Sequence, residues 1–224
     1  MTLVGQSVAI AAKDLRIEVR GRYALGSVLP FAGTLLVAFG LSLGPGRTLL
    51  AETAPGLLWL AVLFASVLSS RRAYEHEGED GALEGLLLAP IDKAAVFIGK
   101  GIAIAVQLLA LELAIVLLVS GLFDLSLAVA PLTLVAALFL GTIGLAAVGS
   151  LFGVLAEAPR AREAVLPLLV LPLATPVLIA GVRATALATA GRAGEAGSWL
   201  GLLLAFDLVF VSVGTLVFGF LLEE

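Results

Sequence analysis

Two carboxylic acids, Glu112 and Asp207, lie inside long apolar stretches of the chain. An ionised carboxyl at the centre of a bilayer is costly unless it is paired or reached by water. Such a residue can therefore line a pathway or a cavity at an interface between two subunits. Alternatively, it is protonated and hydrogen-bonded between neighbouring helices. The sequence favours this second alternative for Glu112 and does not choose between the two for Asp207.

Catalytic and metal-binding motifs are missing from the sequence. The chain has no cysteine, and His76 is its single histidine, so thiolate metal sites are excluded. The patterns H-E-x-x-H and G-x-S-x-G do not occur. These absences argue against an intramembrane enzyme. We expect a non-catalytic chain without a metal site, in which His76 is a solvated loop residue.

The longest acid-rich run, "EGEDGALEGLLLAPIDK" (77–93), contains a short apolar stripe. Leu83, Leu86 and Leu87 are spaced to share one side of a helix of about two turns. Asp80 and Gly81 are suited to its start, and Pro90 is suited to its end. A helix this short is marginal in water alone, so we expect it to dock. It docks either in a groove of a soluble partner or on the ends of its own helices.

The remaining elements are those of an integral membrane protein. The chain is 61% hydrophobic and only 13% charged, with a mean hydropathy of +1.15. Roughly 20 apolar residues in a helix cross a bilayer. Six runs of this kind predict an all-α polytopic membrane protein, and they cover about 24–43, 55–70, 98–120, 127–155, 164–182 and 199–222. The whole chain, 1–224, is then a single transmembrane domain.

The positions of lysine and arginine predict the orientation. If the N-terminus is cytoplasmic, only Arg47, Arg183 and Arg192 of the 13 basic residues lie outside. This asymmetry predicts that both termini are cytoplasmic. Residues 71–93 then form a cytoplasmic loop, and residues 183–198 lie on the outer side as a loop or re-entrant segment. Arg183 and Arg192 are thereby candidates for contact with a partner or for an exit region.

Residues 1–22 read as an amphipathic helix and not as a span. A helical pitch places several apolar side chains on one broad face, namely Val4, Val8, Ala11, Leu15 and Val19. Lys13, Arg16 and Arg20 lie opposite. This pattern predicts a helix lying flat on the inner leaflet, although a frayed polar tail is the alternative.

The acid-rich loop resembles a pattern of ABC-2-type exporter permeases. The matching residues are Glu77, Glu79, Gly81, Leu83, Glu84, Leu86, Leu87 and Pro90, followed by Gly99 and Lys100. Gly78 and Ala82 depart from the basic residue and the threonine often found there. The resemblance implies six spans, an interfacial N-terminal helix and a cytoplasmic coupling helix that sits in a groove of an ATPase subunit.

Three further stretches resemble the haem exporter protein B family of cytochrome c maturation. They are "GLLWLAVLFASVLSSRRAYEHEGEDGALEGLLLAP" (56–90), "REAVLPLLVLPLATPVLIAGVRAT" (162–185) and "WLGLLLAFDLVF" (199–210). The resemblance implies a multi-pass permease subunit of the bacterial inner membrane that works as a homodimer. It also implies a role in haem export or in release of a haem-loaded chaperone.

The expected partners follow from what the sequence does not contain. It has no phosphate-binding G-x-x-x-x-G-K-[ST] pattern, so ATP would bind to a separate ATP-binding cassette ATPase chain. With one histidine, axial haem ligation would come from a haem-handling membrane subunit. We expect no cofactor on this chain and no nucleic acid partner, but a second copy of itself and the lipid bilayer. The alternatives are a permease for a lipid, glycan or drug, and a passive assembly scaffold.

Overall fold

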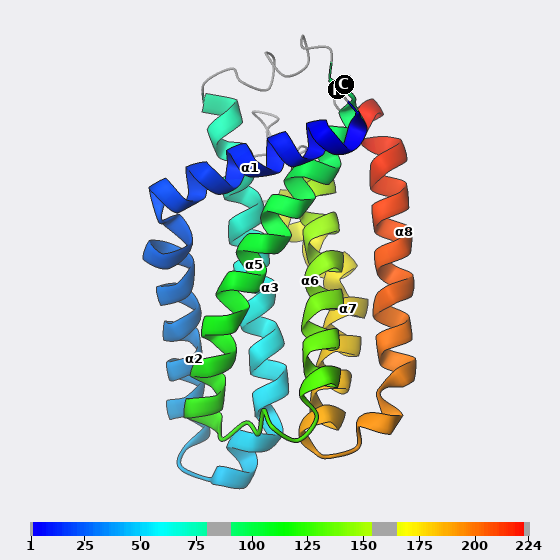
Figure 1. Ribbon diagram of the computed structural model, residues 1–224. Helices are drawn as coiled ribbons and strands as arrows, with labels where there is room; N and C mark the ends of the chain where they lie inside the picture. Colours follow the sequence, from blue (N-terminus) through cyan, green and yellow to red (C-terminus); the bar gives the residue numbers. More distant parts are fainter. Residues whose placement is uncertain (1, 80–90, 154–164, 222–224) are drawn as a thin grey trace.

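The computed structural model describes residues 2–79, 91–153 and 165–221. The secondary structure of these residues is entirely helical. The helix α1 (Leu3–Gly21) lies across one end of a bundle of long helices (Figure 1). The bundle consists of α2 (Leu29–Leu43), α3 (Arg47–Glu79), α5 (Lys93–Phe123), α6 (Pro131–Gly153), α7 (Val165–Thr189) and α8 (Gly197–Leu221).

Six of the described helices are long and apolar enough to cross a membrane, as the sequence predicted. The candidate spans are Ala24–Leu43, Arg47–Tyr74, Lys93–Phe123, Pro131–Gly153, Val170–Thr189 and Gly197–Gly219. The predicted second span, 55–70, was too short. Pro55 lies inside α3, and a proline in a membrane helix can be accommodated when neighbouring groups satisfy the freed backbone.

Local capping explains where several helices begin and end. Thr2 accepts a hydrogen bond from the Gly5 amide at the start of α1, and Asp92 accepts one from the Ala94 amide at the start of α5. Arg22 and Asp124, with φ of 51° and 57°, end α1 and α5 in the left-handed conformation. A short π-helix, η1 (Ala24–Val28), then joins α1 to α2.

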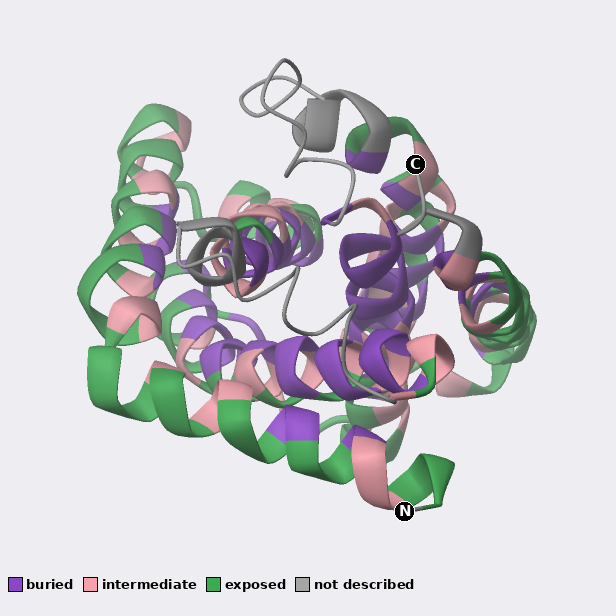
Figure 2. Cartoon of the chain, turned by 90° about the horizontal axis from the view of Figure 1, so that it is seen from above, coloured by how far each residue is buried: buried purple, intermediate pink, exposed green. Residues whose placement is uncertain are grey.

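The buried surface is concentrated on the central helices. In the apolar 18-residue stretch that marks each span, 67% of α3 is buried, whereas only 22% of α2 and 17% of α8 are buried. Seen from above, the buried residues face the middle of the bundle and the exposed ones face outward (Figure 2). The main apolar core includes Leu58, Trp59 and Leu108, and a second cluster around Tyr74, Phe97 and Phe218 lies nearer α1.

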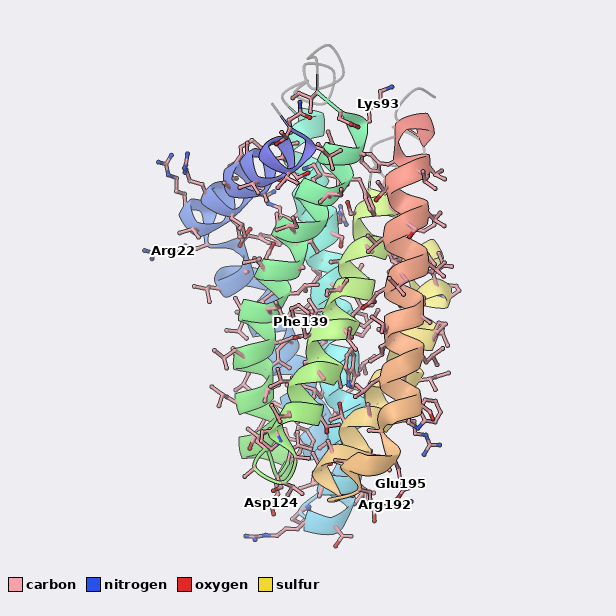
Figure 3. The ribbon with its side chains drawn as sticks, turned by 45° about the vertical axis from the view of Figure 1, so that its right-hand side comes forward. Arg22, Lys93, Asp124, Phe139, Arg192 and Glu195 are labelled. Carbon is pink, nitrogen blue, oxygen red and sulfur yellow. The ribbon has the colours of Figure 1, made fainter. Side chains whose placement is uncertain are left out.

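The two ends of the bundle carry different residues. Arg22 and Lys93 lie at the end covered by α1, which we call the α1 end (Figure 3). Asp124, Arg192 and Glu195 lie at the opposite end, which we call the far end. Because α3 runs toward the α1 end and α5 starts there, both helices flank the segment 80–90 at this end.

Candidate functional site

The structure describes the helix ends on both sides of the predicted coupling segment. Glu77 and Glu79 belong to the last turns of α3. The other predicted coupling residues lie outside the described residues, and they are Asp80, Gly81, Leu83, Glu84, Leu86, Leu87 and Pro90. Directly after the segment, at the same end of the bundle, Asp92 caps the start of α5. The candidate site is therefore the α1 end of the bundle, where α3 leads into the segment and α5 leads out of it.

Helix α1 packs closely on α5 at this end. A Cβ added to Gly99 would lie 2.8 Å from both the Cβ of Ile10 and the carbonyl oxygen of Ser7, so only glycine permits this approach. The Asp92 amide donates a hydrogen bond to Gln6 Oε1 at 3.1 Å, next to the coupling segment. Helix α1 is thus attached to the bundle through the first turns of α5.

The apolar residues of α1 divide between two faces. Ile10 and Ala11 are buried, together with Ser7, against the bundle. Val4, Val8 and Val19 are 68%, 56% and 74% exposed, and they are therefore available for lipid. The predicted single lipid face was wrong for Ala11, because the sequence pattern does not reveal that one side of the helix is covered by α5.

A fully buried lysine joins three helices at the same place. Lys100 Nζ donates to Asp14 Oδ2 of α1 at 3.2 Å and to the carbonyl oxygen of Ala73 of α3 at 2.8 Å. It also lies over the ring of Tyr74, 4.6 Å from the ring centre. Lys100 belongs to the coupling pattern in the sequence, but that pattern does not reveal these contacts. The signal was present, because a lysine two turns inside an apolar helix needs partners.

The network continues from Tyr74 to α6. The Tyr74 hydroxyl donates to the carbonyl oxygen of Ser150 at 2.7 Å, and the Ser150 hydroxyl donates to the carbonyl oxygen of Phe97 at 3.1 Å. A Cβ on Gly153 would lie 2.5 Å from the Tyr74 ring, so the ring rests directly on the α6 backbone. Hydrogen bonds and close packing therefore connect α3, α5 and α6 next to the coupling segment.

The two intramembrane carboxyls approach neighbouring residues of α6 from different helices. Glu112 of α5 is 3% exposed and accepts a hydrogen bond from the Thr142 hydroxyl at 2.5 Å. Asp207 of α8 is 5% exposed, and its Oδ1 would be 2.7 Å from a Cβ on Gly144. Neither Asp207 oxygen has a hydrogen-bond partner among the described residues. The interhelical bond predicted by the packing alternative is thus present at Glu112.

An indole ring fills the centre of the bundle near these residues. Trp59 of α3 is fully buried and donates from Nε1 to the Thr185 hydroxyl of α7 at 2.9 Å. Added Cβ atoms would lie 2.1 Å from the ring at Gly141 of α6 and 2.4 Å from it at Gly181 of α7. The small residues of α6 therefore serve close helix packing.

The far end contains the two candidate arginines, but in different settings. Arg183 is an exposed residue of α7, because this helix continues to Thr189. The predicted outer segment, 183–198, therefore begins too early. Arg192 follows the helix and binds Glu195 through two hydrogen bonds of 2.7 and 2.6 Å. These bonds lower the pKa of the Glu195 carboxyl below its ordinary value of 4.5.

Cavities occur beside the spans, and among the described residues no group of three or more histidine, cysteine, aspartate or glutamate side chains could hold a metal ion. A cavity of about 510 Å³ lies between α2, α3 and α7, and its lining includes Phe39, Glu52, Trp59 and Leu178. A second cavity, of about 500 Å³ and also lined by Glu52, lies nearer the far end beside Asp124. Most of their lining is apolar, and the remainder consists of hydroxyl groups and carboxylates.

The fold and the candidate site define a polytopic helical membrane protein of the permease type. The family profile described as "CcmB protein" matches residues 6–223. The chain therefore belongs to the CcmB protein family.

Curated relatives named heme exporter protein B match most of the chain. The protein from Rhodobacter capsulatus is 37% identical over 178 residues, covering 77% of this chain and 79% of the relative. The one from Pseudomonas aeruginosa is 34% identical over 175 residues, covering 77% of each. The one from Bradyrhizobium diazoefficiens is 32% identical over 217 residues, covering 92% of each.

Proposed function

We propose that this chain is the membrane-embedded permease subunit of an ABC transporter complex for cytochrome c maturation. Its membership of the CcmB family, with relatives named heme exporter protein B over most of their length, is the observation that carries the proposal. The chain itself catalyses no reaction: it neither forms nor breaks covalent bonds. Its work is to convert ATP-driven movement of a separate ATPase subunit into haem export or into release of a haem-loaded chaperone.

The helix ends at the α1 end support a mechanical role. Residues 80–90 connect α3 to α5, and these two helices also contact one another through Lys100. A force applied to this segment by an ATPase would therefore act on two spans at once. The coupling contacts would come from Glu77 and Glu79 in α3 and from the predicted residues between the helices.

The proposal assigns the remaining partners by chemistry. ATP binds to the ATPase chain, and haem is handled by the complex through a haem-handling membrane subunit. A second copy of this chain completes the pathway, because one bundle of six spans does not enclose a pathway between paired ATPases. Glu112 and Asp207 are the candidate polar residues inside the membrane. Arg183 and Arg192 are the candidates on the outer side for contact with a partner or for an exit region. Both termini face the cytoplasm, and the complex lies in the bacterial inner membrane.

A pull-down from native membranes in mild detergent tests this function. The retained proteins are identified by mass spectrometry, and haem is detected by a haem stain. We expect the ATPase subunit together with haem-handling membrane proteins. Recovery of the ATPase alone, without haem or those proteins, would still support a permease. It would then favour a lipid, glycan or drug as the transported substrate.

A pair of variants tests the coupling residues in the same assay. Replacing both Leu86 and Leu87 by aspartate is expected to abolish recovery of the ATPase, because a charged helix face does not enter an apolar groove. Val129→Asp is the matched control, since Val129 is a 49% exposed apolar residue in the loop before α6 at the far end. Unchanged recovery of the ATPase by the double aspartate variant would refute the assignment of these residues.

A further inference from the structure

Among the basic residues that the structure describes, Lys100 is the one whose side chain is completely inaccessible to solvent. Burial of an ammonium group is costly unless charged or polar partners replace the lost water. The structure supplies these partners from two other helices, namely Asp14 from α1 and the Ala73 carbonyl from α3. The face of the Tyr74 ring adds a favourable cation–π contact.

The partners of Lys100 fix the relative positions of three helices. Asp14 is 13% exposed in its side chain and lies in the last two turns of α1, 86 residues before Lys100 in the sequence. Ala73 lies six residues before the end of α3. Lys100 itself lies two turns after the start of α5. A displacement of the end of α3 or of the start of α5 must therefore stretch these contacts or carry α1 along.

The neighbouring contacts favour a movement in which α1 is carried along with α3 and α5. Gly99 and Ile10 bring α1 and α5 into close contact, so a movement of α1 over α5 would have to break this packing. Asp92 contacts Gln6 of α1 directly after the coupling segment. Tyr74 is hydrogen-bonded to α6 and holds its ring beside the Lys100 ammonium group.

We propose that Lys100 and Asp14 form a charge clamp through which α1 moves together with the ends of α3 and α5 when the ATPase acts on the segment between them. Lys100 is thus a positioning residue, whose effect is exerted through α1. The inference rests on the proposed function, because it requires an ATPase that acts at residues 80–90. It assigns to the interfacial helix a moving role in the cycle, beyond that of a static membrane anchor.

The clamp can be tested with a fluorescent label on α1. The chain has no cysteine, so Val8→Cys, at a 56% exposed position of α1, accepts a single environment-sensitive fluorophore. The labelled subunit is combined with its ATPase subunit in liposomes. Emission is recorded before and after addition of a non-hydrolysable ATP analogue, and ATPase binding is measured in parallel by co-purification.

The decisive variant combines Lys100→Met with Asp14→Leu. It removes both charges and keeps apolar volume, and such replacements of buried ion pairs are often tolerated. We expect this variant to bind the ATPase as the parent does and to lose the nucleotide-dependent emission shift. Lys100→Arg keeps the charge and the donors, so it should retain the shift. Lys13→Met is the matched control, because Lys13 also pairs with Asp14, at 3.1 Å, but is 43% exposed.

Each result has a defined meaning. A full emission shift in the doubly substituted protein would overturn the clamp. So would loss of ATPase binding in that variant, because Lys100 would then serve only assembly, and so would a parent protein that binds the ATPase without any shift. A parent protein that fails to bind the ATPase at all would instead contradict the proposed function.

Discussion

The packing of Trp59 makes Gly181→Ala the most informative single substitution in the bundle. The new Cβ would lie 2.4 Å from Cε2 of the indole. Carbon atoms in contact are normally about 3.5 to 4.0 Å apart, so the ring must move by about 1 Å. It cannot retreat toward α6, because the Gly141 backbone occupies the other side. The ring must therefore shift sideways and weaken its 2.9 Å hydrogen bond to Thr185.

The magnitude follows from three contributions to the free energy of unfolding. Overpacking a core costs about 1–3 kcal/mol. The weakened hydrogen bond costs about 1 kcal/mol more. The higher helix propensity of alanine returns up to about 1 kcal/mol. The net loss expected is therefore about 1–3 kcal/mol, and each 1.4 kcal/mol is roughly a tenfold change in the unfolding equilibrium.

Unfolding in mixed micelles with increasing sodium dodecyl sulphate measures this loss. The chain contains two tryptophans, so a Trp199→Phe background makes Trp59 the single reporter. Gly33→Ala is the matched control, because nothing lies within 4 Å of its added Cβ. If Gly181→Ala is as stable as Gly33→Ala and the Trp59 emission is unchanged, the packing argument is refuted.

Two further predictions concern hydrogen-bonded carboxyls. Thr142→Val removes the donor to Glu112 and leaves a buried carboxyl oxygen unpaired, so the free energy of unfolding should fall by about 1–3 kcal/mol, whereas Thr142→Ser should match the parent. Equal stability of the valine and serine variants would contradict this. At the far end, Arg192 lowers the pKa of Glu195, so the pair stabilises the fold above the ordinary pKa of 4.5 and loses this effect as the pH falls through the lowered value. Carbon-13 NMR titration of Glu195 should therefore give a pKa below 4.5, which rises toward 4.5 in Arg192→Gln; an identical titration in both proteins would disprove the linkage.

Hydropathy predicted the spans well because whether a segment can cross a membrane depends mainly on its own length and apolar composition. The first span, predicted over 24–43, coincides with the helical span found there. The second was predicted to begin at Pro55, since Arg47 and Glu52 lower the hydropathy before it. In the structure α3 starts at Arg47 and continues through this proline. Hydropathy detects the apolar part of a membrane helix, and it does not show that the helix continues through polar residues at its end.

The partners of individual residues were less accessible to sequence reasoning. Small residues in a membrane helix are typical of close packing, but they do not show that Gly141 meets Trp59 or that Gly153 meets Tyr74. The pairing of Lys100 with Asp14 spans 86 residues, and it depends on how α1 docks on α5. A local pattern shows that a buried charge needs a partner, but only the tertiary arrangement determines which partner it obtains.

The distribution of packing determines how a displacement at the α1 end would spread. Tyr74 and Trp59 of α3 rest on glycines of α6, and Lys100 of α5 is bonded to α1 and α3, so these elements have little freedom to move independently. In contrast, α2 and α8 bury the smallest shares of their spans. A movement of α3 and α5 is thus passed first to α6 and α1, through contacts of backbone against ring and of charge against charge. The ring of Phe97 in α5 likewise rests on Gly214 of α8, where an added Cβ would lie 2.1 Å from it, so α8 is drawn into the same movement. Helix α2 is packed less tightly on α5, since a Cβ on Gly40 would lie 3.5 Å from the Phe123 ring, and we expect α2 to follow last.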